Sequence, residues 1–224
     1  DLGVALVEFG AEVTNVSVYA AGMLLGLVTI PMGSGDMTDA IASAFGIRRF
    51  QAERLKCVHG SAIASPSDHR EMIPVNAPGD EMTGPIARHA DDKNRIPRAE
   101  LISVITEQMA RLMDEVGRAL KSLGFTGQRG QQIVLTGGGA ELAGLADYAQ
   151  SALGKPVRIG RPLHIKGLPE AHATPGFSTL TGLVLYAAAD PIDIRKVGRA
   201  KQDITRFDKL GLVGRVYRAL REYF

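Results

Sequence analysis

The chain has 224 residues, of which 45% are apolar and 22% charged, with a formal net charge of +2. This composition is typical of a soluble globular protein and excludes a disordered, a collagen-like or a disulfide-rich chain. The net charge hides an asymmetry, because residues 195–224 carry nine basic and three acidic side chains, a net of +6 that leaves −4 for the rest. We therefore expect the C-terminal tail to meet an anionic partner.

The start of the chain and its cysteine content point to a cytosolic protein. The chain begins at Asp1, inside an apolar run and without the features of a signal peptide, so we interpret it as the C-terminal part of a longer protein. The single cysteine, Cys57, cannot form an intramolecular disulfide, which fits a reducing compartment.

Three strands are expected first. Residues 2–8 form an apolar run, and residues 13–35 carry no charge over a length that could span a bilayer. The second segment consists of two β-type runs, however, separated at Ala21-Gly22 and ended by Pro31. We predict a buried β-hairpin there and no membrane span.

Helices and a loop-rich stretch follow. Apolar spacing predicts helices over 37–45 and 49–58. Residues 59–95 are rich in Pro, Ser, Asp and Gly, and only 72–75 resemble a strand. A single apolar stripe predicts a long helix over 97–123, with Pro97 in its first turn.

Strands and helices alternate in the last part of the folded region. The predicted order is a strand at 131–136, a glycine-rich turn, a helix at 141–153, a strand at 157–159 and a helix at 178–188. A strand meander followed by such alternation indicates an α/β fold.

The most chemically specific segment contains Gly137, Gly138 and Gly139. A buried strand leads directly into the three glycines and then into a helix, so backbone N–H groups can face an anion or a flat ring. The segment is neither a Walker loop nor a G-x-G-x-x-G run. Taken alone, it is equally well explained as a tight strand-to-helix turn.

A second candidate is the turn after the first strand, residues 8–13. There Glu8 ends a strand and Gly10 follows two positions later, which could cup a phosphate or could be a bare hairpin turn. The two segments lie 127 residues apart, counted from Gly10 to Gly137. In this order, the turn at 8–13 resembles the second phosphate loop of the actin-like ATPase superfamily, and the three-glycine segment resembles its adenosine motif.

In more detail, the chain resembles the FtsA family of bacterial cell division proteins. The further segments that carry this resemblance are 42–47, 52–56, His59-Gly60, 157–160, Gly167-Leu168 and 177–183. The resemblance implies an actin-like (ribonuclease H-like) nucleotide-facing subdomain made of 1–32 and 129–189, with a smaller α+β subdomain inserted at 33–128. A flexible linker, 190–208, and an amphipathic C-terminal helix, 209–224, would follow.

The resemblance also implies a nucleotide site for ATP with Mg²⁺. The residues that match the family's site are Glu8, Gly10, Ala11, Glu53, Lys56, Gly137, Gly138 and Gly139. Glu53 would accept hydrogen bonds from ribose hydroxyls, and the stem of Lys56 would pack along the base. Without the resemblance, these two residues would be interpreted as an ion pair on a helix surface. The family's other half-cleft would be needed for catalysis, so we expect weak or no hydrolysis, and none from this part alone.

The phosphate loop departs from the family pattern. Where the family usually has Asp-Ile-Gly-Gly-Gly-Thr, residues 8–13 read Glu-Phe-Gly-Ala-Glu-Val. Two glycines and a hydroxyl are lost, and Glu12 adds a negative charge near the terminal phosphates, a repulsion of about 1 to 4 kcal/mol. We therefore expect weakened nucleotide binding unless a metal ion bridges Glu12 to the phosphates.

The tail has the pattern of a membrane-binding helix. Its apolar face consists of Leu210, Val213, Val216, Tyr217, Leu220 and Phe224. Its basic side consists of Arg215, Arg218 and Arg221. Such a helix buries its apolar face in its own domain, in a partner or in lipid, and the polar linker before it, 190–208, argues against docking on its own domain. Each basic residue adds about 1 kcal/mol at an anionic surface.

The resemblance further implies partners and a location. FtsA-like proteins polymerise as actin-like filaments on the cytoplasmic face of the cell inner membrane, hold the tubulin-like protein FtsZ at the division site and recruit other division proteins. The inserted subdomain would receive the C-terminal peptide of FtsZ through Arg98, with Arg95 and Arg88 as further candidates. All three could instead be ordinary surface arginines.

Two other functions are considered. A sugar-kinase or chaperone-type ATPase half would share the fold but would not need a membrane tail. A nucleic-acid-binding arm would be basic without an organised apolar face, whereas this tail gathers Tyr217, Tyr223 and Phe224 on one side. We therefore expect no nucleic acid among the partners.

Overall fold

The computed structural model describes residues 3–76, 95–126, 131–162 and 169–189. The chain divides into two units, 1–181 and 182–224, and the second is described only for 182–189. No helix in these described stretches is long and apolar enough to cross a membrane.

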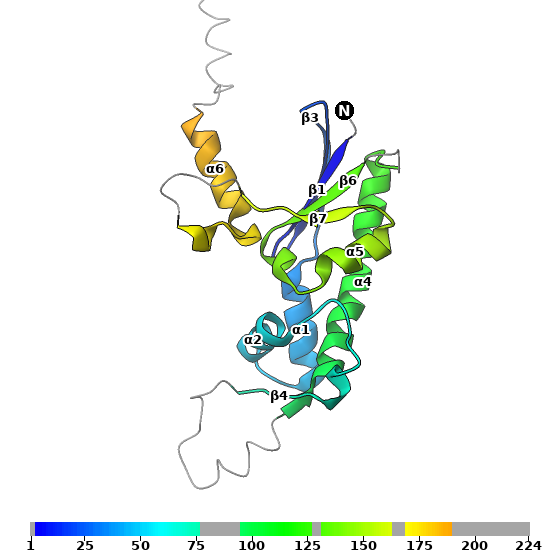
Figure 1. Cartoon of the computed structure of the whole chain (residues 1–224), viewed down its shortest axis with the longest axis vertical. Coiled ribbons are helices and arrows are strands. Elements are labelled where there is room, and N and C mark those ends of the chain that lie inside the picture. Colours follow the sequence, from blue (N-terminus) through cyan, green and yellow to red (C-terminus); the bar gives the residue numbers. More distant parts are fainter. Residues whose placement is uncertain (1–2, 77–94, 127–130, 163–168, 190–224) are drawn as a thin grey trace, which may run out of the picture. The chain divides into compact units, whose positions relative to one another are not determined.

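A five-stranded mixed sheet with the order β3-β2-β1-β6-β7 forms the centre of the first unit (Figure 1). Its strands are β1 (Val4–Phe9), β2 (Thr14–Ala20), β3 (Met23–Ile30), β6 (Gln132–Thr136) and β7 (Val157–Ile159). The first three form an antiparallel meander, whereas β6 runs parallel to both β1 and β7. These five predicted strands are confirmed.

The helices also follow the prediction closely. The helix α1 (Ser34–Phe45) packs against α2 (Arg49–His59) and against the long α4 (Arg98–Ser122), as Figure 1 shows. At its other end α4 contacts β2, β3 and α5 (Leu145–Leu153). Its predicted stripe is buried at Leu101, Ile105, Met109, Leu112, Val116 and Leu120. The helix α6 (Ser178–Ala188) also has the predicted bounds.

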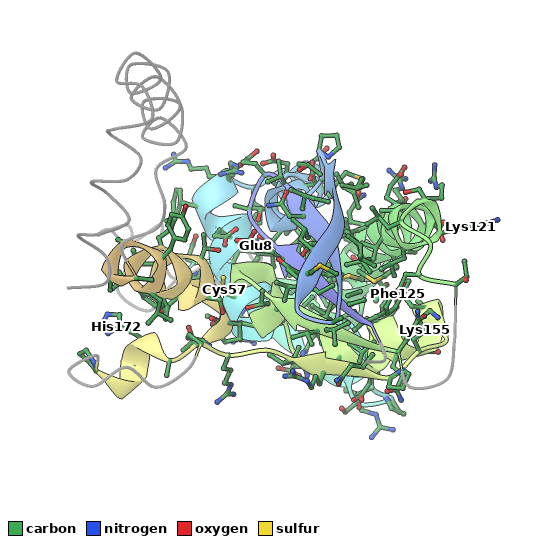
Figure 2. The ribbon with its side chains drawn as sticks, turned by 90° about the horizontal axis from the view of Figure 1, so that it is seen from above. Glu8, Cys57, Lys121, Phe125, Lys155 and His172 are labelled. Carbon is green, nitrogen blue, oxygen red and sulfur yellow. The ribbon has the colours of Figure 1, made fainter. Side chains whose placement is uncertain are left out.

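A lysine lies over an aromatic ring near the end of the sheet where β1 begins. The Nζ of Lys155 lies 5.1 Å from the centre of the Phe125 ring, and Figure 2 labels both residues. A Cβ added at Gly3 would lie 3.9 Å from the same ring. The two glycine-containing turns predicted from the sequence lie at the opposite end, where β1 and β6 finish.

A second, two-stranded sheet was only half predicted. The strand β4 (Met72–Pro74) was expected, but its antiparallel partner β5 (Arg95–Pro97) was not. Pro97 is extended and precedes α4 instead of standing in its first turn. The pairing with β4 holds Pro97 in this extended conformation.

Two further differences have local causes. The helix predicted from residue 141 begins at Leu145, because Gly144 takes a left-handed conformation with φ of 74° and a 3₁₀ turn, Gly138–Glu141, precedes it. The hairpin predicted as buried is buried in β2, but β3 is an edge strand. Its side chains at Met23, Leu24, Leu25 and Leu27 are between 54 and 64% exposed.

Candidate functional site

The two glycine-containing turns predicted to form the site lie side by side. The ends of the parallel strands β1 and β6 meet there, since Glu8 is in register with Thr136. An added Cβ at Gly137 would lie 2.5 Å from the carbonyl oxygen of Phe9, and one at Gly139 would lie 2.5 Å from the Phe9 ring. Close packing of the two turns therefore requires both glycines.

Gly138 differs from its two neighbours. A Cβ at this position would meet no atom within 4 Å, and the residue is exposed. Gly137 also has φ of 88°, a conformation that glycine alone adopts easily. The interpretation as a tight turn thus accounts for Gly137 and Gly139, and it leaves Gly138 as the open point where a flat or anionic ligand can approach the backbone.

The turn after β1 is fixed against the start of α1. The backbone N–H groups of Ser34 and Gly35 donate to the carbonyl oxygens of Gly10 and Ala11, at 2.9 and 2.7 Å. A Cβ at Gly33 would lie 2.2 Å from the oxygen of Ala11, so this contact depends on glycine. The first N–H groups of α1 are therefore occupied by the turn itself, while the side chain of Glu12 is exposed.

Glu8, labelled in Figure 2, lies in a row of polar side chains across the strand ends. Asn15 donates to Glu8 Oε2 at 3.0 Å, and Thr29 donates to Asn15 at 2.8 Å. The hydroxyl of Thr179 donates to the other carboxylate oxygen of Glu8, Oε1. Thr136 continues the row through its hydroxyl contact with Ser178 at 2.6 Å. The predicted Glu8 is thus oriented by Asn15 and Thr179, neither of which was predicted as a site residue.

Glu53 and Lys56 lie in a network that joins α2 to the start of α1. The Nζ of Lys56, whose side chain is only 8% exposed, donates to Ser34 O, Thr38 Oγ1 and Glu53 Oε2 at 2.8 to 2.9 Å. Thr38 also donates to Glu53. Lys56 therefore holds the two helices together and orients Glu53, while the roles at the nucleoside stay predictions.

The network keeps Glu53 ionised. Burial acts to raise the pKa of this carboxyl, but the hydrogen bonds from Lys56 and Thr38, together with the charge of Lys56, outweigh it and hold the pKa below its ordinary value of 4.5. The Glu53 side chain is 49% exposed, so a charged acceptor faces solvent beside α1.

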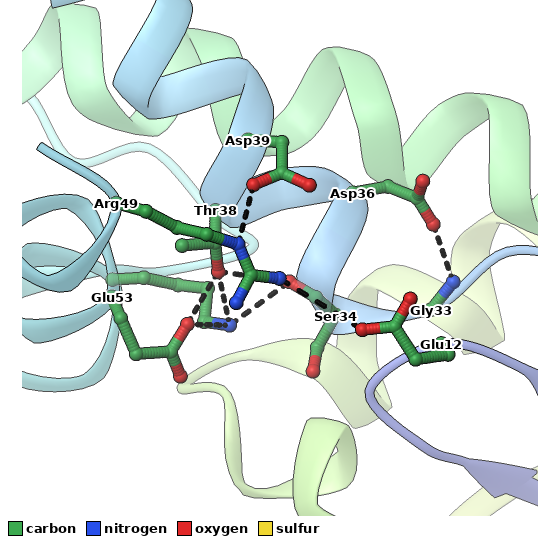
Figure 3. Close-up of polar contacts among 9 residues, drawn as sticks. Glu12, Gly33, Ser34, Asp36, Thr38, Asp39, Arg49 and Glu53 are labelled. Atoms are coloured by element: carbon green, nitrogen blue, oxygen red, sulfur yellow. Dashed lines mark hydrogen bonds and ion pairs between the residues drawn. The ribbon is translucent and has the colours of Figure 1, made fainter.

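Glu12 has a counter-charge that the sequence did not reveal. As Figure 3 shows, Arg49 joins Glu12 and Asp39: its Nη2 lies 3.8 Å from Glu12 Oε1, and its Nε donates to Asp39 Oδ1 at 2.6 Å. The hydrogen bond and charge of Asp39, with smaller contributions from Glu12 and Glu53, raise the pKa of Arg49. Arg49 therefore offsets part of the negative charge that Glu12 brings to the turn.

The structure describes two of the three arginines that were predicted to bind a partner peptide. Arg98, at the first turn of α4, pairs with Asp68 and Glu71 at 3.0 and 3.1 Å, and Arg95 is exposed in β5. Arg88 and every predicted membrane residue of 209–224 lie outside the described residues.

The described stretches also hold no group of three or more His, Cys, Asp or Glu that could bind a metal ion.

Comparisons with known proteins agree with the resemblance. The sequence profile described as "Cell division protein FtsA" matches residues 5–182. The cell division protein FtsA of Rhizobium meliloti (strain 1021) is 33% identical over 198 residues, 88% of this chain and 43% of that protein. FtsA of Escherichia coli (strain K12) is 34% identical over 187 residues, 83% of this chain and 44% of that protein. The chain thus spans less than half the length of these relatives.

A solved structure supports the fold. MreB5 of Spiroplasma citri bound to ADP matches with a TM-score of 0.59 at 16% identity, over 84% of this chain and 54% of that one. At this identity the likeness concerns the fold alone, and it confirms the expected actin-like α/β architecture. Because the family profile covers most of the described residues, the chain belongs to the FtsA family of cell division proteins.

Proposed function

We propose that this protein is an actin-like adaptor of bacterial cell division that binds ATP with Mg²⁺. The observation that carries the nucleotide part is the meeting of two segments distant in sequence, where the backbone of Phe9 packs against Gly137, its ring packs against Gly139, and Gly138 stays open. In this proposal the phosphates approach Gly10 and Ala11, and the adenosine lies between Gly138 and Glu53. A magnesium ion bound with the nucleotide would reduce the repulsion between Glu12 and the phosphates.

The proposed organisation follows the expected boundaries. Residues 1–32 and 129–189 contribute one side of the nucleotide cleft, and 33–128 form the docking subdomain for FtsZ. The chain spans 43 to 44% of its relatives, so the opposite side of the cleft is assigned to the remaining part of such proteins. Hydrolysis is not proposed for this part by itself.

We assign membrane attachment to the tail. The linker 190–208 and the basic, amphipathic segment 209–224 would hold the protein on the cytoplasmic face of the inner membrane at the division site. Each copy would bind reversibly, and assembly into a filament would strengthen attachment through many weak contacts. A tethered filament would then retain FtsZ and recruit further division proteins. Membership of the FtsA family makes a sugar-kinase or chaperone-type function the weaker alternative.

Removal of residues 209–224 is expected to abolish sedimentation of the full-length protein with liposomes that contain anionic lipid. Val216→Glu should have the same effect, because a charge in the apolar face opposes its insertion. Val216→Leu keeps that face apolar and serves as the matched control. Unchanged sedimentation of the truncated protein would remove the membrane role from the tail.

A further inference from the structure

Arg98 is shared by two carboxylates that differ in their surroundings. Its Nη1 lies 3.0 Å from Asp68 Oδ1 and 3.1 Å from Glu71 Oε2, and its Nε donates to the carbonyl oxygen of His59 at 3.2 Å. The side chain of Asp68 is 1% exposed, whereas that of Glu71 is 46% exposed. One guanidinium thus has a buried and a solvent-facing acidic partner.

The two partners are not equally replaceable. Asp68 also accepts a hydrogen bond from the backbone N–H of Ser65, and a buried carboxylate needs a cation beside it. Glu71 is screened by water, so its contact with Arg98 is weak and its side chain can turn away at little cost. The backbone of Glu71 stays in place when its side chain turns away, because the backbone N–H of Arg98 donates to the carbonyl oxygen of Glu71 at 2.9 Å.

We propose that Glu71 occupies, on Arg98, the place that a carboxylate of an acidic peptide takes when it docks, so that Glu71 sets the affinity of this surface by competition. The proposal rests on the proposed function, in which an acidic peptide binds at Arg98. The exposed cations Arg70, one residue before Glu71, and Arg95, three residues before Arg98, would attract further acidic groups of the same peptide.

The matched control for Glu71→Gln is another carboxylate paired with an arginine, on the helix α4 that begins with Arg98. Glu107 pairs with Arg111 at 2.6 Å, and its side chain is 63% exposed. Glu107→Gln therefore removes the same charge from a comparable carboxylate–arginine pair in another part of α4. A general electrostatic effect would appear equally in Glu71→Gln and Glu107→Gln, whereas competition at Arg98 would appear only in Glu71→Gln.

The test measures binding of a fluorescent peptide with the sequence of the FtsZ C-terminal tail to the full-length protein by anisotropy. Glu71→Gln is expected to bind it about threefold more tightly or better, because a neutral amide competes less well for the guanidinium. Glu107→Gln should bind like the wild type.

Two failures are distinguishable. If the wild type binds the peptide and Arg98→Lys weakens binding, but Glu71→Gln is no tighter than Glu107→Gln, competition by Glu71 is overturned and docking at Arg98 stands. If neither the wild type nor Glu71→Gln binds the peptide, the proposed docking function itself fails, and the inference fails with it.

Discussion

Gly137→Ala is expected to lower the free energy of unfolding by about 3 kcal/mol, with a fall of about 6 to 12 °C in melting temperature. Two effects add. The alanine would adopt φ of 88° and ψ of 167°, a region that glycine occupies almost alone and that costs about 1 to 3 kcal/mol for a residue with a Cβ. Its Cβ would also lie 2.5 Å from the backbone oxygen of Phe9, so a main-chain shift is required. Thermal unfolding followed by circular dichroism measures the change.

Gly138→Ala is the matched control for Gly137→Ala. The added methyl group meets no atom within 4 Å and φ is not in the left-handed region, so stability should stay within about 0.5 kcal/mol of the wild type. Equal destabilisation by the two substitutions would contradict the division of the three glycines into two that pack and one that is open.

Arg98→Ala is expected to destabilise the protein by about 3 to 5 kcal/mol, because it leaves the carboxylate of Asp68 buried without a counter-charge. Arg111→Ala on the same helix breaks the exposed pair with Glu107 and should cost less than about 1 kcal/mol. Chemical denaturation of the two variants measures the difference.

A second substitution separates charge from packing at this position. Adding Asp68→Asn to Arg98→Ala removes the unpaired buried charge and should recover part of the lost stability. If Arg98→Ala were no more destabilising than Arg111→Ala, Arg98 would be an ordinary surface arginine. Loss of peptide binding in an unstable Arg98→Ala protein would not by itself identify a contact, which is why Arg98→Lys is the informative binding variant.

Local patterns were sufficient for most of the fold. The meander of β1, β2 and β3 follows from apolar runs separated by Ala21-Gly22 and Pro31, and α4 follows from a single long apolar stripe. The strand β5 could not be predicted in the same way, because three residues before a helix become a strand only through pairing with β4. Exposure of the β3 side chains likewise depends on the position of β3 at the sheet edge.

The site was predicted from motifs and resemblance, and its supporting contacts were not. The motifs and the family resemblance together indicated Glu8 and the glycine turns, but nothing local distinguishes Gly138 from Gly137 and Gly139. Arg49 was missed because it is 37 residues from Glu12, and only the fold brings the two together. The network around Lys56 was underestimated for the same reason, since Ser34 and Thr38 come from a different helix.

The most direct measurement is a calorimetric titration of the full-length protein with ATP, with and without Mg²⁺, beside a Gly138→Val variant. The account predicts saturable binding that is stronger with Mg²⁺, because the ion offsets Glu12, and that is lost in Gly138→Val while the fold is kept. Absence of binding by the folded full-length protein at millimolar ATP with Mg²⁺, or undiminished binding by Gly138→Val, would contradict the proposed nucleotide site.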